Sequence, residues 1–350
     1  MSSEALPVTY VLPLRWTRPG PTEELRAYLS ELRGFVAETI VVDGSPAPLF
    51  DEHAAALQGL ARHLPPHNDL SYAMGKVNGV VTGVRESSQE LVVVADDDVR
   101  YAAASLRRVA EMLGEADLVR PQNYFDELPW HARWDTARSL LNRVFSGDID
   151  FPVGDFPGTL AVRRSAFFAA GAYDGDALFE NLELMRTIRA AGGKVSTPLD
   201  LYVPRRPPTA RHFISQRVRQ AYDDFAVPLR IAAFLFVGPA ALLALSRGRR
   251  RQVALAAAGA MAVAEIGRRR AGGARHFPLS ASLFVPAWVA ERAICSWLAL
   301  GAKLAGGVRY GDGRLAHSAT SMRRLRRRYS ERGGATAPSA PPSARKPVAL

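Results

Sequence analysis

Apolar residues in the first two thirds of the chain follow two alternating patterns. Short apolar runs of the kind that form buried strands are separated by stretches in which apolar residues recur at helical spacing. The expected strands are Val8–Leu14, Glu38–Val42, Leu91–Ala95 and Asp117–Arg120. The expected helices are Thr22–Leu32, Lys76–Val84 and Ala102–Leu113. Strands that alternate with helices predict an α/β fold with a mostly parallel sheet flanked by helices.

The pattern changes after Ala226, where long apolar runs separated by arginine clusters begin. The runs 227–246 and 279–305 are long enough to cross a bilayer, whereas 252–266 is short. The alternative is that these runs form buried helices of a soluble domain. We predict three parts: an α/β domain over residues 1–226, two or three C-terminal membrane helices over 227–310, and a basic, disordered tail over 311–350.

The two halves of the chain also differ in charge. Residues 227–350 hold 21 Lys and Arg against 4 Asp and Glu, a net charge of +17, whereas residues 1–226 hold 24 against 30, a net charge of −6. Basic clusters between long apolar runs suit an anionic membrane surface better than nucleic acid. Membrane lipids are therefore an expected partner, and nucleic acid is not. The single cysteine, Cys295, excludes a disulfide framework.

The side of the membrane follows from the N-terminus and from the arginine clusters. Residues after Met1 lack the pattern of a secretory signal, so we expect the cytoplasmic membrane as location, with residues 1–226 facing the cytoplasm. Three spans would leave arginine clusters on both sides of the bilayer, which conflicts with the positive-inside tendency. A shallow or re-entrant segment at 252–266 avoids that conflict.

The strongest chemical signal is Asp96-Asp97-Asp98, directly after the apolar strand. Three adjacent carboxylates repel one another, and a divalent cation would remove the repulsion. Mg²⁺ or Mn²⁺ usually takes one or two carboxylates together with phosphate oxygens. The alternative is an acidic cluster at the start of the following helix.

A second acidic turn, Asp43-Gly44-Ser45, ends another expected strand. A carboxylate at this place can accept hydrogen bonds from a nucleotide base or ribose, and in an α/β sheet the ligand lies beyond the carboxyl ends of the strands. The alternative is an ordinary Asp-Gly turn.

Together these pieces resemble glycosyltransferase family 2, in its bacterial membrane-anchored type with the GT-A fold, over residues 8–226. The matching segments are Tyr10–Pro13 with the first strand, Val42–Ser45 with the nucleotide-binding turn, Lys76–Gly79 with a Gly-Lys stretch, Ala95–Asp98 with the DXD motif, and 157–164 with an acceptor-side strand. The resemblance implies that Asp43 contacts the nucleoside and that Asp96 and Asp98 hold Mg²⁺ or Mn²⁺ on the diphosphate. It also implies that Lys76 and Asp97 belong to the donor site.

The helix that carries the catalytic base in this family resembles Glu180-Asn181-Leu182-Glu183-Leu184. The usual base aligns with Asn181, and an amide cannot accept the proton. We expect Glu180 to be the base, with Asp176 in reserve. Glu183 lies one helical turn further on and is placed to pair with Arg186.

A further partial match lies just before the apolar runs. Gln216-Arg217-Val218-Arg219-Gln220 resembles the QXXRW motif of membrane-bound members, with Gln220 in place of Trp. Arg219 would then bind the donor diphosphate, a role that suits a guanidinium. The alternative is an amphipathic helix whose arginines contact lipid phosphates. For the aromatic stretch 124–134, sugar binding and domain packing both stay open.

The resemblance implies an inverting, metal-dependent hexosyltransferase that moves a sugar from a UDP- or GDP-linked donor to a lipid-linked or cell-envelope glycan acceptor. Two other classes stay open: a metal-dependent nucleotidyltransferase and a catalytically inactive membrane scaffold. Asn181 and the missing Trp favour the scaffold, whereas the three retained carboxylates at 96–98 disfavour it.

Overall fold

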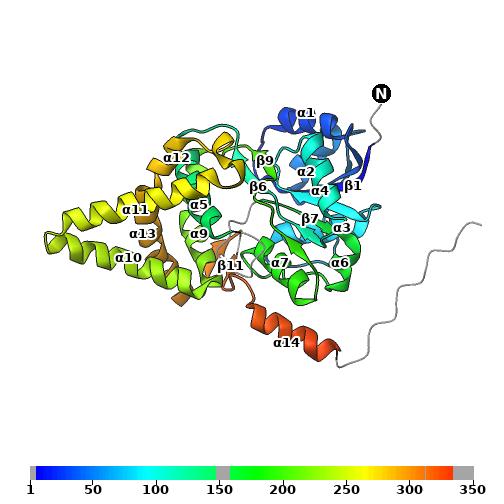
Figure 1. The fold of residues 1–350 in the computed structure, drawn as a ribbon. Coiled ribbons are helices and arrows are strands. Elements are labelled where there is room, and N and C mark those ends of the chain that lie inside the picture. The colour runs from blue at the N-terminus through cyan, green and yellow to red at the C-terminus, as the bar shows by residue number, and fades with distance from the viewer. Residues whose placement is uncertain (1–4, 147–157, 312, 334–350) are drawn as a thin grey trace, which may run out of the picture.

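A seven-stranded sheet forms the centre of the computed structural model, which describes residues 5–146, 158–311 and 313–333 (Figure 1). Its strands are β1 (Leu6–Leu14), β2 (Val36–Asp43), β3 (Arg62–Leu64), β4 (Leu91–Ala95), β5 (Leu118–Val119), β7 (Thr159–Arg163) and β8 (Val195–Ser196). Their order is β3-β2-β1-β4-β7-β5-β8. Only β7 runs antiparallel to its neighbours β4 and β5 within this sheet of the described residues, so the predicted mostly parallel α/β fold is confirmed.

Helices cover both faces of the sheet (Figure 1). On one face lie α1 (Thr22–Leu32), α2 (Ala47–Ala56) and α4 (Ala103–Met112); on the other lie α3 (Gly75–Glu86), α6 (Arg164–Ala169) and α7 (Glu180–Ala190). Neighbouring residues of one strand belong to the hydrophobic cores on opposite faces of the sheet. Tyr10 packs with Leu29 of α1, whereas Val11 packs with Val80 of α3. This alternation is the period of two that a pleated strand imposes. It explains why the strands read as continuous apolar runs.

One glycine shows how closely α3 approaches the sheet. A Cβ on Gly83 would lie 2.2 Å from a side-chain carbon of Val11 on β1. Such a distance is far inside van der Waals contact, so the helix reaches this depth only because glycine has no side chain. The close approach fixes α3, whose N-terminal end carries Lys76, against β1 and β2.

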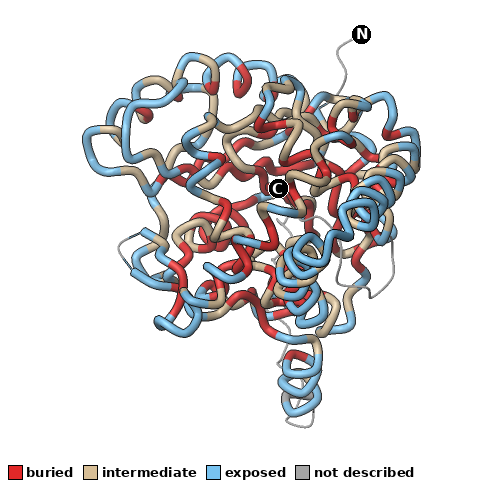
Figure 2. The backbone as a smooth tube through the Cα atoms, turned by 90° about the vertical axis from the view of Figure 1, so that its left-hand side faces the viewer, coloured by how far each residue is buried: buried red, intermediate tan, exposed pale blue. Residues whose placement is uncertain are grey.

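A helical region packs beside the sheet, and all of it except α5 follows the sheet along the chain. It contains α5 (Trp130–Phe145), α9 (Arg217–Asp223), α10 (Pro228–Ser246), α11 (Arg250–Arg269), α12 (Leu279–Leu283) and α13 (Val285–Leu304). Helices α10 and α11 form a hairpin that projects away from the α/β region (Figure 1). Buried backbone concentrates in the centre of the molecule, away from such projections (Figure 2). Helix α13 packs on α9, α10 and α5, and its Cys295 and Ala299 share a core cluster with residues of the sheet, so it joins the helical region to the rest.

One helix within the described residues, α10, is long and apolar enough to cross a membrane, and only 6% of its apolar window is buried. The predicted membrane segment 279–305 differs from this, because it is divided at Phe284 into α12 and α13. Trp288 and Arg292 on α13 are almost fully buried. The sequence predicts two or three membrane helices, and among the described residues only α10 has the length and composition of one.

The chain returns to the α/β region after α13. Strands β10 (Val308–Tyr310) and β11 (Gly313–Leu315) form a small hairpin, and helix α14 (Met322–Gly333) follows. Between them the backbone of Leu178 and Phe179 donates hydrogen bonds to the carbonyls of His317 and Ser318. Part of the segment 311–350, predicted as a disordered tail, thus forms a strand (β11) and a helix (α14), while 334–350 lie outside the described residues.

Candidate active site

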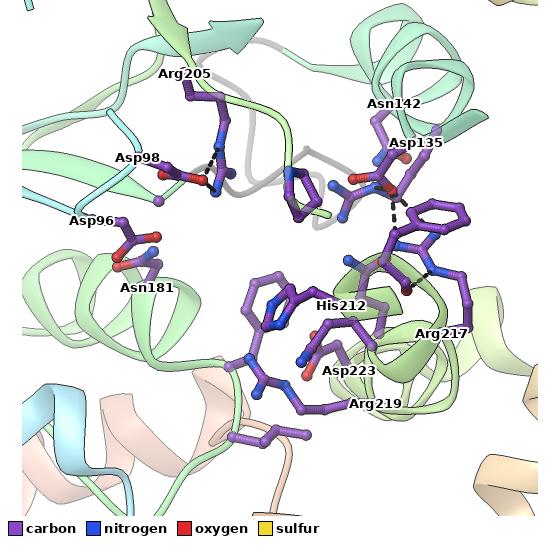
Figure 3. A pocket seen from close by; sticks show the side chains of 18 of the residues that line it. Asp96, Asp98, Asp135, Asn142, Asn181, Arg205, His212, Arg217, Arg219 and Asp223 are labelled. Atoms are coloured by element: carbon purple, nitrogen blue, oxygen red, sulfur yellow. Dashed lines mark hydrogen bonds and ion pairs between the residues drawn. The ribbon is translucent and has the colours of Figure 1, made fainter. Parts of the chain in front are cut away.

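A cavity of about 320 Å³ opens beyond the carboxyl end of β4, between the sheet and the helical region. One side is formed by the acidic turn 96–98 after β4 and by the start of α7. The other side is formed by α8 (Ala210–Ser215), α9 and α5. Figure 3 shows Asp96, Asp98 and Asn181 on the first side and His212, Arg219 and Asp223 on the second.

Each carboxylate of the acidic turn has its own partner. Asp96 forms an ion pair of 2.6 Å with Lys76, Asp97 accepts a 2.6 Å hydrogen bond from the indole nitrogen of Trp16, and Asp98 accepts from the Arg205 guanidinium. Arg205 belongs to β9 (Tyr202–Arg205), which pairs with β6 (Gln122–Phe125) in a second sheet. Cations and donors from three distant segments thus hold the three like charges together.

The glycine that faces this turn is needed for space. A Cβ on Gly158 would lie 1.9 Å from Oδ2 of Asp96, and the backbone nitrogen of Asp96 donates a 2.8 Å hydrogen bond to the Gly158 carbonyl. Any other residue at this place would displace the Asp96 carboxylate. The approach of 158 to the acidic turn therefore fixes the position of that carboxylate.

Lys76 joins the acidic turn to the start of α7. Its ammonium lies 2.6 Å from Asp96 and 2.8 Å from Glu180, and all three side chains are mostly buried. Burial alone would lower the pKa of Lys76, but the two carboxylates outweigh it and raise that pKa. Lys76 therefore stays charged and holds both carboxylates at the edge of the cavity.

Asp98 carries a buried oxygen that nothing satisfies. Among the described residues, no hydrogen-bond donor reaches its Oδ1. Burial raises the pKa of Asp98, and repulsion from Asp96 and Asp97 adds to this, while Arg205 opposes it. A buried carboxylate oxygen without a donor is free to bind a cation.

Asp43 lies at the end of β2, yet its side chain points into the protein. It is 1% exposed and accepts hydrogen bonds from His53 on α2 at 2.7 Å, from His63 on β3 at 3.0 Å and from the Ser45 backbone at 2.8 Å. Burial would raise the pKa of Asp43, but these donors outweigh it and lower that pKa to about 2. Asp43 thus shapes the turn around Gly44 and does not line the cavities beside it.

Gly44 instead lines a second cavity of about 330 Å³, next to the first. Asp96 and Asp97 line both cavities, and Lys76, which pairs with Asp96, lines the second. Tyr310 of β10 closes its far side, and the Arg219 guanidinium lies 5.3 Å from the centre of that ring. The two cavities together give an elongated site, with the acidic turn at its middle.

Two charged residues at the end of α9 line the first cavity. Arg219 and Asp223 are four residues apart, and four residues bring side chains to one face of a helix. Asp223 has a buried Oδ1 that no donor reaches in the part of the chain that the structure describes. Burial raises the pKa of Asp223 to about 7, with help from Glu180 and Asp224 and against the attraction of Arg219 and Arg292.

No known protein family matches this chain by sequence, and no curated protein matches it either. Solved structures do match. A mannosyltransferase from Pyrobaculum calidifontis, in complex with GDP-Man and Mn²⁺, aligns over 85% of this chain and 88% of its own with a TM-score of 0.51 and 18% identity.

The chain has the GT-A fold. A glucosyl- and a mannosyl-3-phosphoglycerate synthase match with lower TM-scores. The glucosyl-3-phosphoglycerate synthase from Mycobacterium tuberculosis, crystallised with Mn²⁺ and UDP, has 19% identity over 59% of this chain and 74% of its own, with a TM-score of 0.41. The mannosyl-3-phosphoglycerate synthase from Rubrobacter xylanophilus has 16% identity over 59% and 69%, with a TM-score of 0.42.

Within this GT-A fold the predicted site residues divide into two groups. Those that line the cavities are Lys76, Asp96, Asp97, Asp98, Glu180 and Arg219. Asp43 is turned away from them, as described above. Asp176 is exposed and accepts a hydrogen bond of 2.9 Å from the Ala73 backbone.

Glu183 is also accounted for by structure. It is fully buried, and the backbone nitrogen of Thr320 donates to its Oε2. Arg186, its expected partner, donates to the carbonyls of Thr320 and Ala226. Both side chains thus hold the returning C-terminal segment against α7.

The aromatic stretch 124–134 mostly packs between helices. Trp134 donates a 2.8 Å hydrogen bond to Glu291 on α13 and lies beside Phe284. His131 contacts the carbonyl of Pro208 at 2.7 Å. Phe125 alone of this stretch's described aromatic residues lines the first cavity. Of the two interpretations, domain packing is the one that these contacts describe.

Three residues of the site were missed from sequence: Arg205, Asp223 and Tyr310. Arg205 sits in a short strand, and Tyr310 is the last residue of the stretch 227–310 in which membrane helices were expected. Asp223 did leave a signal, an acidic pair with Asp224 inside an otherwise basic stretch. Its meaning depends on neighbours from α7 and α13, which sequence spacing does not reveal.

Proposed function

We propose that the protein is an inverting, metal-dependent glycosyltransferase of family 2 that works at the surface of the cytoplasmic membrane. It moves a hexose from a UDP- or GDP-linked donor to a lipid-linked or cell-envelope glycan acceptor. The observation that carries the proposal is the elongated site of the GT-A fold, with Asp96 and Asp98 at its middle and Arg219 beside it. The mannosyltransferase of the same fold was crystallised with GDP-Man and Mn²⁺.

In this proposal the nucleoside occupies the cavity bordered by Gly44 and Tyr310. The diphosphate then lies at the acidic turn, where Lys76 and Arg219 supply positive charge. A guanidinium and an ammonium stabilise the charge that grows on the leaving diphosphate as the sugar departs. The sugar points into the first cavity, where the acceptor meets it.

A divalent cation fits the acidic turn. Among the described residues, no three His, Cys, Asp or Glu side chains form a metal-binding group of their own. Mg²⁺ and Mn²⁺ in such sites take one or two carboxylates and complete their shell with phosphate oxygens, which is the share that Asp96 and Asp98 would supply. The unsatisfied Oδ1 of Asp98 supports this. When bound, the cation neutralises charge on the departing diphosphate.

The helical region supports a membrane-bound acceptor. Large apolar side chains on α10 are exposed, with Leu229 at 84% and Phe236 at 72%. Such a surface is typical of protein that contacts lipid. If α10 crossed the bilayer, Arg247–Arg251 would lie on the side opposite the catalytic region, against the positive-inside tendency. A hairpin of α10 and α11 that lies in the interface keeps both on the cytoplasmic side.

The test is release of nucleoside diphosphate by detergent-purified full-length protein. The donors are a panel of UDP- and GDP-sugars, supplied with Mn²⁺, Mg²⁺ or chelator and with a bacterial total-lipid extract as acceptor. We expect release from one donor, dependent on metal, and a loss of at least about 10²–10³-fold in the Asp96→Asn/Asp98→Asn double variant. Absence of release from every donor would exclude a transferase and favour an inactive scaffold. Transfer of the nucleoside monophosphate to an acceptor, with release of sugar 1-phosphate in place of nucleoside diphosphate, would indicate a nucleotidyltransferase.

A further inference from the structure

The position that should hold the base contains an amide, and the expected replacement is already engaged. Asn181 lines the first cavity but cannot take a proton. Glu180 lines it too, but its Oε1 lies 2.8 Å from the Lys76 ammonium, which is shared with Asp96. A carboxylate in a tight ion pair is a poor base, because protonation would break the pair. Asp176 is outside the cavity.

Asp223 lines the same cavity and, among the described residues, has no such partner. Asp97 on the acidic turn has no ion pair within the described ranges either, but it accepts a hydrogen bond from Trp16. It ends α9 and lies beside His212 and Arg219, across the cavity from Asp96 and Asp98 (Figure 3). Its neighbour Asp224 is different, because Arg230 at 2.9 Å and Arg292 at 3.2 Å neutralise it. No ion pair of 4.0 Å or less engages Asp223 among the residues that the structure describes, and its Oδ1 is buried without a donor.

We propose that Asp223 is the general base of this enzyme, an inference that rests on the proposed function. The acceptor hydroxyl gives its proton to the Asp223 carboxylate while its oxygen forms a bond to the anomeric carbon of the donor sugar. The bond between that carbon and the diphosphate oxygen breaks, and its electron pair leaves with the nucleoside diphosphate. Attack from the α9 side, opposite the acidic turn, gives the inversion.

The groups around Asp223 suit this role. Burial, Glu180 on α7 and the adjacent Asp224 disfavour its charged form, while Arg219 on its own helix and Arg292 on α13 favour it. The pKa of about 7 that results is close to what a base needs at neutral pH: deprotonated when the acceptor arrives, and basic enough to take the proton. The pKa of the nearby His212 is lowered by burial and by Arg219, so this histidine adds little positive charge at neutral pH.

The test compares Asp223→Asn with wild-type protein in the donor-cleavage assay, with the donor that wild type cleaves, Mn²⁺ and the lipid extract. We expect kcat to fall by about 10²–10⁴-fold at pH 8, with the KM for the donor unchanged. The wild-type rate should fall as the pH drops through about 7, because the base becomes protonated. That acid limb should be absent from the residual rate of Asp223→Asn, and Asp223→Glu should recover part of the activity.

Controls separate this role from a structural one. Asp51→Asn removes an exposed carboxylate on α2 that lines neither cavity, and it should leave the pH profile unchanged. Nucleotide affinity and the melting temperature of Asp223→Asn should match wild type. Normal turnover by Asp223→Asn, or loss of activity through weakened donor binding alone, would overturn the assignment of the base and leave the transferase intact. If wild type itself cleaves no donor, the proposed function fails and the base fails with it.

Discussion

The α/β region and the helical region treat apolar residues in opposite ways. In the first, strands and helices bury most of them: Val11, Leu12, Leu29 and Val80 are at most 2% exposed. In the second, α10 leaves Leu229 and Phe236 mostly exposed, although this helix is apolar along its whole length. The difference is the one expected under the proposed function, in which water surrounds the sheet and lipid contacts the hairpin.

Buried charges join the helices of the helical region to one another. Asp224, between α9 and α10, lies 2.9 Å from Arg230 and 3.2 Å from Arg292 on α13, and it is 4% exposed. Arg217 on α9 pairs with Asp135 on α5 at 3.2 Å and approaches Glu291 on α13 at 3.5 Å. Charged partners on different helices fix the hairpin's direction relative to the site.

The largest effect is expected at this junction. Asp224→Ala would leave the Arg292 guanidinium, which is 1% exposed, without its carboxylate. Removing one partner of a buried pair typically costs about 3–5 kcal/mol. We expect a loss of this size in the free energy of unfolding, measured by chemical denaturation in detergent.

A matched control for that prediction is the exposed pair Arg327–Glu331 on α14, whose side chains are 80% and 61% exposed. Glu331→Gln should change stability by less than about 1 kcal/mol. Equal losses in the two variants would mean that the buried Asp224 does not stabilise the junction of α9, α10 and α13.

The sheet and its acidic turns could be predicted because their signals are local. Leu91–Ala95 is apolar throughout, and the chain must turn where Asp96 begins, so strand and site edge follow from neighbouring residues. The role of Asp43 could not be found in this way. Its partners His53 and His63 lie 10 and 20 residues away, and only the fold turns the carboxylate toward them.

The helical region was harder to predict for the same reason. Glu291 and Arg292 are adjacent in sequence, which suggests that they pair with each other. The structure gives them separate partners instead, with Trp134 and Arg217 for Glu291 and Asp224 for Arg292. Neighbours on a helix point about 100° apart, so an apolar run with two charges reads as a membrane span until its partners are known.

The next largest effect concerns Asp43 in the α/β region. Its folded-state pKa of about 2 lies below the ordinary 3.8, so it stabilises the fold fully above pH about 4, and this stabilisation is lost as the pH falls toward 2. We expect Asp43→Asn to cost about 2 kcal/mol at pH 7, with the gap to wild type narrowing below pH 4. Denaturation series at pH 7 and pH 3 measure both values. A gap of equal size at the two pH values would refute the charge-based explanation.

A smaller effect is expected on vesicle binding, and it compares the exposed apolar surface of α10 with that of the α/β region. Phe236→Ser on α10 removes an aromatic side chain that is 72% exposed, and Phe168→Ser on α6 removes one that is 41% exposed on the α/β region. If α10 contacts lipid, the first change should weaken binding to phosphatidylcholine–phosphatidylglycerol vesicles by about tenfold. The second should leave binding unchanged. Flotation of the purified protein with such vesicles measures this, and equal behaviour of the two variants would argue against a lipid contact through α10.

The smallest effect has the opposite sign and tests the charge of the hairpin. Glu265 on α11 binds Arg268 at 2.7 Å and Arg269 at 2.6 Å, so it neutralises part of a basic cluster. Hydrogen bonds from these two arginines lower the pKa of Glu265 to about 2, and it stays charged at neutral pH. Glu265→Gln would release positive charge toward the lipid surface. Because one basic charge near an anionic surface contributes about 1 kcal/mol, we expect binding to vesicles with phosphatidylglycerol to rise about two- to fivefold. Binding to pure phosphatidylcholine should not change, and high salt should remove the gain. A gain on neutral vesicles would instead mean that the substitution acts through the apolar surface, and the hairpin would then bind lipid without its arginines.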